Sequence, residues 1–443
     1  MVPWCLSSNA SSRARSGSAT PGRRRRPPGA VFRGSHLVHC RRAEGEVEAD
    51  AEKPATGRRW DGYAVDAASL ISSASFGQLF IAWPNLAERH LGASPSQIGL
   101  IGALYQGFYV GSVLLSRRAA GTLDWRTQAV VSSLALTLGA VGMAFATTLN
   151  ALFVLVSFFG VATSWLWPPV MGRVSTGLEG AALNQRLGRF NASWSSGMVL
   201  GPLMGGLLFD IHPTAPFWFA AVCHVISLGL FFVCAPLRTT ATGDEPPSAD
   251  AAATDRMIVY RRMARVAVVS GYVALGLLRI QLPGLANDLG VGATRQGLIG
   301  TFLSLTMAVG FALLGRHAWW HHKAGWMWAF QGGLGASLLL AYSASGAGSL
   351  FLCGGLAGVG ISFLYASHLY YGVAGGRNRT ARMAVHEILV STGFLIGSFG
   401  GGVLAEAGTL ATPYWVGCAV LQAGILVQAG IFAAHRRTQQ DPK

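Results

Sequence analysis

Apolar segments follow one another along most of the chain, from about residue 64 to residue 434. Each has about the 20 residues that an α-helix needs to cross a bilayer. A longer polar stretch divides the segments into two groups of six. The pattern predicts an all-α membrane protein with twelve transmembrane helices. We place them near residues 64–84, 97–116, 127–147, 150–172, 187–209 and 215–236, and then near 263–284, 295–315, 325–345, 348–371, 382–404 and 412–434.

Composition agrees with a membrane protein and excludes most soluble classes. Charged residues make up 12% of the chain, whereas a soluble domain has about 25%. The net charge of +15 does not predict a nucleic-acid partner, because the basic residues gather in the N-terminal segment and in short loops. The sequence has no phosphate-binding lysine loop, GxSxG or HExxH motif. We therefore expect no enzymatic activity, no cofactor and no metal.

The segments outside the helices set the predicted domain boundaries. Residues 1–60 are rich in Arg, Ser, Gly and Pro without an apolar period, which is typical of a disordered tail. The same composition suits an organellar transit peptide or a start placed too early, and these alternatives stay open. We expect a six-helix half over 61–236, a cytoplasmic linker over 237–262, a second half over 263–435 and a tail over 436–443.

Loop charge predicts the orientation of the helices. Cytoplasmic loops of membrane proteins carry an excess of Lys and Arg. Here the basic residues concentrate in the connections that follow even-numbered helices, and the opposite loops carry only Arg89 and Arg295. Both termini are therefore predicted to be cytoplasmic, in a plasma or inner membrane rather than an organellar one.

Two glycine-rich segments indicate close helix packing and an internal repeat. Residues at i, i+4 and i+8 share one face of a helix, and a glycine face lets membrane helices approach closely. The second segment follows the first after about 196 residues, and Gly-Leu-Ile-Gly likewise occurs at 99–102 and 297–300. The packing residues are Gly197, Gly201, Pro202, Gly205 and Gly206 in the first half, and Gly393, Gly397 and Gly401 in the second.

On these features the chain resembles the major facilitator superfamily of secondary transporters, over about residues 64–434. The resemblance rests on the six-plus-six layout, the long middle loop and the sequence GMVLGPLMGG, which is similar to the fifth-helix glycine–proline motif of the superfamily. The resemblance implies a cavity between helices 1, 4, 7 and 10 that opens to either side as the halves rock. It also implies that the glycine–proline motif packs the halves together.

One loop departs from the family pattern. Between helices 2 and 3 the superfamily usually has G-x-x-x-D-R-x-G-R-R, with the Asp acting in the gate. This chain has Leu115 at the Asp position, and Arg117 and Arg118 keep the basic charge. Asp124 is a candidate substitute from further along the loop, so the chemistry of this gate stays open.

Polar and aromatic residues within the spans are candidates for the cavity wall. An ionisable group at bilayer depth costs at least about 2.5–3.5 kcal/mol, so it needs a partner or a function. Arg279 either binds an anion or extends its side chain to the outer interface, and Gln281 can share either role. Aromatic rings with a few polar groups suit a partly apolar solute. The cavity candidates are Gln78, Trp167, Arg279, Gln281, Tyr365 and His368.

Three titratable residues are candidates for proton coupling. Glu387 and the adjacent His386 lie near the cytoplasmic start of helix 11, where a buried carboxyl and an imidazole can exchange protons at physiological pH. The alternative for Glu387 is an ion pair with a neighbouring arginine. Asp66 lies near the start of helix 1, where the helix dipole favours a negative charge.

The sequence thus predicts a secondary transporter that moves a small organic solute by alternating access, with proton-coupled efflux of a drug or metabolite favoured. We expect a monomer in the lipid bilayer, with H⁺ as the coupling ion. Two alternatives remain. One is an organic-anion carrier that uses Arg279, and the other is a sensor or scaffold of the same fold that does not transport.

Overall fold

The computed structural model describes residues 59–119, 123–175, 178, 180–235, 255–373 and 379–440, and over these residues the chain is helical and has no strand. All of them belong to one compact unit. The predicted tail over 1–60 lies outside the described residues except for its last two, with which α1 begins at Arg59. Of the predicted linker over 237–262, residues 255–262 are described and belong to α7, so the linker ends earlier than predicted.

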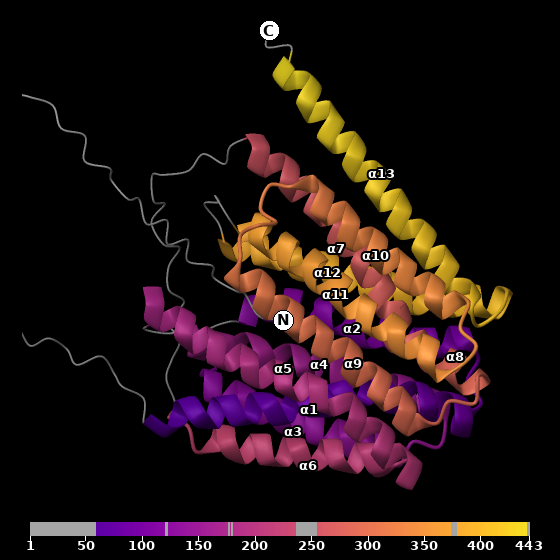
Figure 1. The fold of residues 1–443 in the computed structure, drawn as a ribbon. Coiled ribbons are helices and arrows are strands. Elements are labelled where there is room, and N and C mark those ends of the chain that lie inside the picture. The colour runs from indigo at the N-terminus through magenta and orange to yellow at the C-terminus, as the bar shows by residue number, and fades with distance from the viewer. Residues whose placement is uncertain are drawn as a thin grey trace, which may run out of the picture. The chain divides into compact units, whose positions relative to one another are not determined.

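The helices form two groups along the chain (Figure 1). The first group comprises α1 (Arg59–Leu91), α2 (Pro95–Ala119), α3 (Trp125–Ala144), α4 (Leu149–Ser175), α5 (Gly180–Ile211) and α6 (Ala215–Phe232). The second comprises α7 (Asp255–Gly276), the π-helical turn η1 (Leu277–Gln281), α8 (Leu282–Asp288), α9 (Ala293–Arg316), α10 (Ala324–Tyr342), α11 (Ala347–Val373), α12 (Arg379–Ala407) and α13 (Thr412–Gln440).

The twelve-helix prediction is confirmed, because α7, η1 and α8 continue one another and each predicted segment overlaps one long helix. By length and composition, ten of the described helices can cross a membrane. The other two long helices are α5 and α10, in which Gly, Ser and Trp lower the hydropathy. The predicted seventh segment begins too late, since α7 starts eight residues before 263 (263 − 255 = 8).

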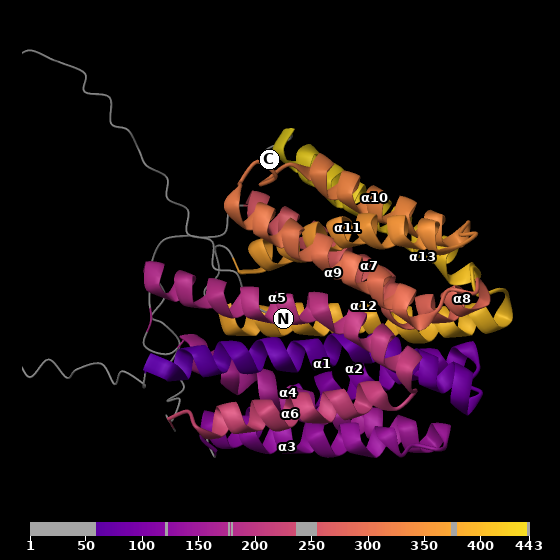
Figure 2. The ribbon, with the colours of Figure 1, turned by 60° about the horizontal axis from the view of Figure 1, so that its bottom comes forward.

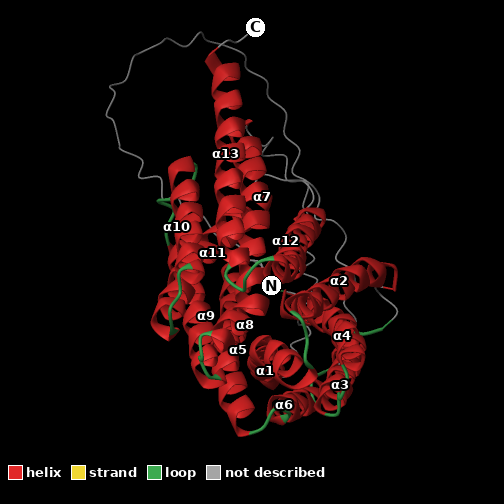
Figure 3. Ribbon diagram, turned by 90° about the vertical axis from the view of Figure 1, so that its right-hand side faces the viewer, coloured by secondary structure: helices red, strands yellow, loops and turns green. Residues whose placement is uncertain are grey.

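Each group packs mainly on itself, and two pairs of helices join the groups. In the first group α1 packs on α5 and α6, and α3 packs on α4 and α6. In the second, α7 packs on α12 and α13, and α11 packs on α9 and α10. The joining pairs are α2 with α12 and α5 with α9 (Figures 2 and 3). One buried apolar cluster runs through both groups.

The glycine face of α5 packs mainly against α1 of its own group. A methyl group built on Gly201 would lie 2.5 Å from the carbonyl oxygen of Ala74, and one on Gly205 would lie 2.6 Å from that of Gln78. A methyl group on Gly197 would overlap the hydroxyl of Ser73. These three glycines therefore let α1 and α5 approach within one group, and do not pack the halves together as the resemblance implied.

The next residues of the same motif do join the groups. The carbonyl oxygen of Pro202 lies where a methyl group on Gly297 of α9 would be, and a methyl group on Gly206 would overlap the carbonyl oxygen of Ala293. The motif therefore packs on two helices, α1 of its own group and α9 of the other group, because successive residues of a helix point in different directions.

The second group repeats the same arrangement on α12. Gly393 and Gly397 approach the α7 carbonyl oxygens of Val269 and Val273, as the first glycines of α5 approach α1. Gly401 approaches Leu277, and Gly402 approaches the carbonyl oxygen of Pro95 at the start of α2 in the other group. The sequence repeat is therefore also a repeat of contacts.

A substitution at Gly201 tests this packing. We expect Gly201→Ala to lower the free energy of unfolding by about 1–3 kcal/mol, because its methyl group would press on the α1 backbone. The matched control is Gly188→Ala in the same helix, where a methyl group would meet no atom within 4 Å. That variant should be neutral or stabilising, since Ala favours helix. Thermal unfolding of the purified protein measures both, and equal stabilities would contradict the packing described.

Candidate functional site

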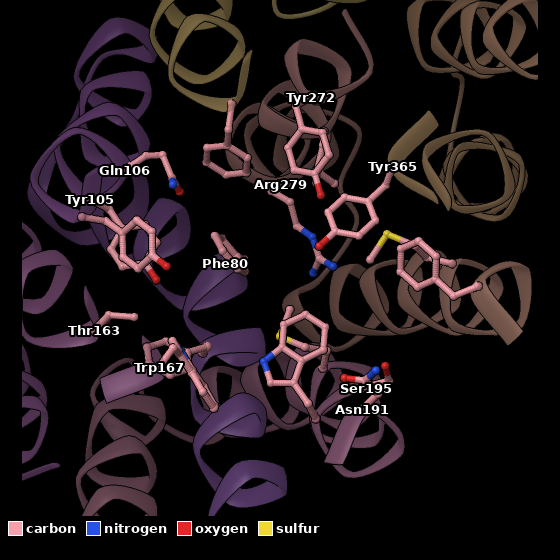
Figure 4. Close-up of a pocket in the computed structure, with 18 residues that line it drawn as sticks. Phe80, Tyr105, Gln106, Thr163, Trp167, Asn191, Ser195, Tyr272, Arg279 and Tyr365 are labelled. Carbon is pink, nitrogen blue, oxygen red and sulfur yellow. The ribbon is translucent and has the colours of Figure 1, made fainter. Parts of the chain in front are cut away.

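A cavity of about 150 Å³ lies between the two groups of helices. The end of the bundle where α6 ends and α7 begins is here called the linker end, and the opposite end the far end. Helices α1, α2, α4 and α5 form one wall, and α7, η1, α9, α11 and α12 form the other (Figure 4). Residues labelled in the figure are Phe80, Tyr105, Gln106, Thr163, Trp167, Asn191, Ser195, Tyr272, Arg279 and Tyr365.

Three of the six predicted cavity residues line this cavity, namely Trp167, Arg279 and Tyr365. Gln78 and Gln281 are buried elsewhere and tie helices together. The Gln78 amide donates to the carbonyl oxygen of Pro216 at 2.7 Å. The Gln281 amide donates to the carbonyl oxygen of Ser398 at 2.9 Å. Both glutamines have a packing role in this structure.

Arg279 is buried, with 6% of its surface exposed, and it faces the cavity rather than the outer interface. It lies in the π-helical turn η1. One guanidinium nitrogen donates to the hydroxyl of Ser304 at 2.9 Å. The guanidinium carbon lies 5.2 Å from the ring centroid of Phe80, which belongs to the other group. Arg279 therefore touches both walls of the cavity.

His368, the sixth predicted cavity residue, pairs with His386. Their Nδ1 atoms are 2.6 Å apart, and the two rings stack with centroids 4.8 Å apart. Both side chains are buried, and the Nε2 atom of His386 has no hydrogen-bond partner. The His386 ring also packs on the ring of Tyr365 in a T-shaped arrangement, with the two centroids 4.8 Å apart. The pair therefore lies behind the cavity wall and contacts it through Tyr365.

Among the ion pairs of the described residues, none joins Glu387 to Arg186, Arg189 or Arg382, the three arginines considered as its partners. The Glu387 side chain is partly buried, and the Oε2 atom is buried without a hydrogen-bond partner. Glu387 is not among the residues that line the cavity, but it adjoins His386, whose ring centroid is 4.8 Å from that of Tyr365 in the cavity wall.

Asp66 is fully engaged at the linker end of the first group. Arg186 binds one of its oxygens at 2.6 Å and Arg189 binds the other at 2.7 Å. Nearby, the carboxylate of Asp61 lies 3.5 Å from Arg173. These ion pairs tie the start of α1 to α4 and α5, and they leave Asp66 no free oxygen facing the cavity.

The loop after α2 uses its acidic residue to start the next helix. Asp124 is the N-cap of α3, where its side chain accepts from the backbone nitrogens of Arg126 and Thr127. Leu115 is 67% exposed. The side chains of Arg117 and Arg118 lie outside the described residues. Asp124 therefore serves as a helix cap in this structure.

The sequence reasoning missed much of the first group's wall. Asn191, Trp194, Ser195 and Met198 of α5 line the cavity. Their spacing of i, i+3, i+4 and i+7 is that of one helical face, so this signal was available beside the glycine face. Phe76 and Phe80 of α1 carry no comparable polar signal, because aromatic pairs at this spacing are usual in any packed helix.

Two carboxylates close the far end across the groups. Asp210 at the end of α5 accepts from the backbone nitrogen and the hydroxyl of Thr294, at 2.9 and 2.6 Å. Glu406 at the end of α12 accepts from the hydroxyl of Ser94 at 3.0 Å and the backbone nitrogen of Ser96 at 3.2 Å. Each carboxylate thus binds a helix N-terminus, where negative charge is favoured, and the two positions differ by the repeat offset (406 − 210 = 196).

Further polar contacts reinforce this end. The amide of Asn85 donates to Gln296 at 2.8 Å, and that of Asn287 donates to Glu88 at 2.6 Å. The Gln106 amide donates to the hydroxyl of Ser391 in the other group at 2.6 Å. Among the described residues, no hydrogen bond between the groups lies nearer the linker end than this one. The described structure is therefore sealed on the far side of the cavity.

The comparisons with known proteins agree with this architecture. A profile of the Major Facilitator Superfamily matches residues 66–279. Over these residues the chain is similar to the major facilitator superfamily. The tetracycline resistance protein, class D, of Salmonella ordonez is 28% identical over 191 residues, which cover 39% of this chain and 44% of that protein. The matched region is less than half the length of that relative.

Two solved transporters of this superfamily share the fold. The nucleoside transporter NupG superposes on 84% of this chain and 99% of its own, with a TM-score of 0.65 and 12% identity. The human organic anion transporter MFSD10 (TETRAN) covers the same 84% and 99%, with a TM-score of 0.59 and 15% identity. The fold is thereby confirmed as the sequence predicted it, and the profile match agrees with the family resemblance.

The far-end seal can be tested at Gly402. A methyl group there would overlap the carbonyl oxygen of Pro95 across the groups, so we expect Gly402→Ala to open the far end. The measurement is the rate at which Ser195→Cys in the cavity reacts with a membrane-impermeant thiol reagent added from the far side. It should rise at least about fivefold, because overpacking that costs about 1–3 kcal/mol shifts the equilibrium between the closed and open states by about 5- to 150-fold.

Gly400→Ala is the matched control, since a methyl group at Gly400 would meet no atom within 4 Å. It should leave the labelling rate unchanged. If both alanine variants label Ser195→Cys at the parental rate, the seal does not depend on this contact.

Proposed function

We propose that this chain is a secondary transporter that moves a small organic solute across a membrane by alternating access. The observation that carries the proposal is a cavity between two pseudo-equivalent groups of helices, closed at one end by contacts that repeat from group to group. Such a seal can form and break as the groups rock about a central site. A sensor or scaffold has no need of an enclosed cavity, so this alternative is less well supported.

The proposal also includes the orientation of the helices in the membrane and the direction of transport. The excess of basic residues in the linker-end loops places this end in the cytoplasm, in a plasma or inner membrane, and the described conformation is then closed toward the outside. Efflux is favoured by the glycine–proline motif and by the relative named for tetracycline resistance. In this proposal Pro202 and Gly206 form part of the moving contact, and the protein acts as a monomer.

Proton coupling is proposed to involve Glu387, with the His368–His386 pair beside it. Glu387 combines a buried, unpartnered oxygen with a position next to His386, which contacts Tyr365 of the cavity wall. A carboxyl group in such a place is a candidate for reversible protonation. Asp66 is a weaker candidate, because both of its oxygens are held by arginines.

The organic-anion alternative has one observation in its favour, which is the guanidinium of Arg279 in the cavity wall. It concerns the substrate rather than the transport cycle, and it is compatible with proton coupling.

Glu387→Gln tests the coupling. In inside-out vesicles with an imposed proton gradient, a transported compound should discharge the gradient in the parent protein, as reported by a pH-sensitive dye. The compounds are lipophilic cations, neutral drugs and organic anions. The variant should abolish the discharge while solute binding persists, because glutamine keeps the shape but cannot release a proton.

Asp288→Asn is the matched control, since Asp288 is an exposed acid at the far end, and it should discharge the gradient like the parent. A Glu387→Gln protein that exchanges protons at the parental rate would exclude Glu387 as the coupling group. If no compound discharges the gradient in the parent while one accumulates passively, transport is uncoupled.

A further inference from the structure

Arg279 is held in an unusual backbone segment. Leu277–Gln281 form the one π-helical turn in the part of the chain that the structure describes. Such turns are rare, and they occur frequently at functional sites. Here the turn interrupts the long helix α7–α8 beside the cavity and carries Arg279 in its third position. Pro283 follows the turn and has no N–H to donate to the carbonyl oxygen of Arg279, so the sequence itself favours an irregular turn at this residue.

The charge of Arg279 has no counter-ion among the residues that the structure describes. Among the described residues, the ion pairs involve Asp61 and Asp66 at the linker end, and none includes Arg279. Its contacts are the hydroxyl of Ser304 and the face of Phe80. A buried cation without an acidic partner is unfavourable, so a negative charge brought by a ligand would be strongly favoured there.

The guanidinium also keeps donors for a ligand. Arginine has five N–H groups arranged in a fork that matches a carboxylate. One of its nitrogens, Nη2, donates to the Ser304 hydroxyl. Since Arg279 lines the cavity, its other N–H groups are available on that side. Charge-assisted, two-point hydrogen bonds of this kind are among the stronger ones in proteins.

The rest of the wall favours an aromatic body. Rings from both groups surround the space, and Phe80 and Tyr365 lie on opposite sides of Arg279 in Figure 4. A cavity of about 150 Å³ accommodates a molecule of about the size of benzene. Aromatic rings pack on one another with favourable edge and offset geometries. Size, wall and charge thus select a compact, ring-containing ligand.

We propose that the cavity binds an aromatic organic monoanion, with its carboxylate or equivalent group on Arg279 and its ring among the aromatic side chains of the two walls. The inference rests on the proposed transport function and deepens it, because it names the substrate class. One cation in the wall corresponds to one negative charge on the ligand.

Binding to the purified full-length protein tests the proposal without a transport assay. The probes are benzoate, the neutral isostere benzamide, and acetate, which has the charge without the ring. Isothermal titration calorimetry should show benzoate binding at least about tenfold more tightly than either of the others. Equal affinities for benzoate and benzamide would overturn the proposal.

Substitution of Arg279 identifies the contact. Arg279→Gln should remove the preference for benzoate over benzamide, and Arg295→Gln should keep it, because Arg295 is an exposed arginine of α9 outside the cavity. If Arg279→Gln does not fold, Arg279→Lys keeps a positive charge without the planar fork. The lysine variant should then still prefer benzoate, less strongly, and loss of all preference in a folded lysine variant would also contradict the proposal.

The two proposals fail in different ways. Proton-coupled export of a lipophilic cation together with no benzoate binding would leave transport standing and remove the anion site. Benzoate binding that depends on Arg279, in a protein that moves no solute in vesicles, would keep the site and remove the transport function.

Discussion

The close approach of helix backbones at glycine is the constraint on which this structure depends. In a membrane every backbone polar group must be satisfied within its own helix, so helices associate through packing and scattered polar contacts. Gly201 on α5 and Gly397 on α12 remove the side chain where α1 and α7 pass, and the neighbouring Gly206 and Gly402 do so at the contacts between groups. One short motif thus stabilises the packing within each group and also the contacts that close the far end between the groups.

That closure defines the site. Because α5 and α12 carry carboxylates at their ends, each reaches the N-terminus of a helix in the other group. In each contact a carboxylate interacts favourably with the dipole of a helix N-terminus. Such a contact is directional, and it can break without leaving a cavity in a packed core. The far end can therefore be tight and reversible, whereas the ion pairs of Asp61 and Asp66 hold helices of one group together.

The sequence predicted the architecture well, because its signals are local. Segment length and the repeated glycines need no knowledge of distant contacts. The site was harder, because it depends on which face of each helix meets the cavity. Gln78 and Gln281 have the same polar character as true wall residues, yet neighbouring backbones engage them. His368 and His386 were assigned separate roles, and their contact across α11 and α12 is visible only in three dimensions.

The π-helical turn at Leu277–Gln281 has a consequence for how this protein can vary. A π turn holds one residue more than an α-helix of the same length, and one residue corresponds to a rotation of about 100° about the helix axis. A deletion of a single codon within the turn would restore a regular helix and leave both flanking helices intact. Because the wider turn absorbs its extra residue, both flanking helices would keep their faces, and only residues within the turn, Arg279 among them, would change direction. The charge of the cavity can thus be changed by altering the length of the chain, with no substitution in the cavity wall.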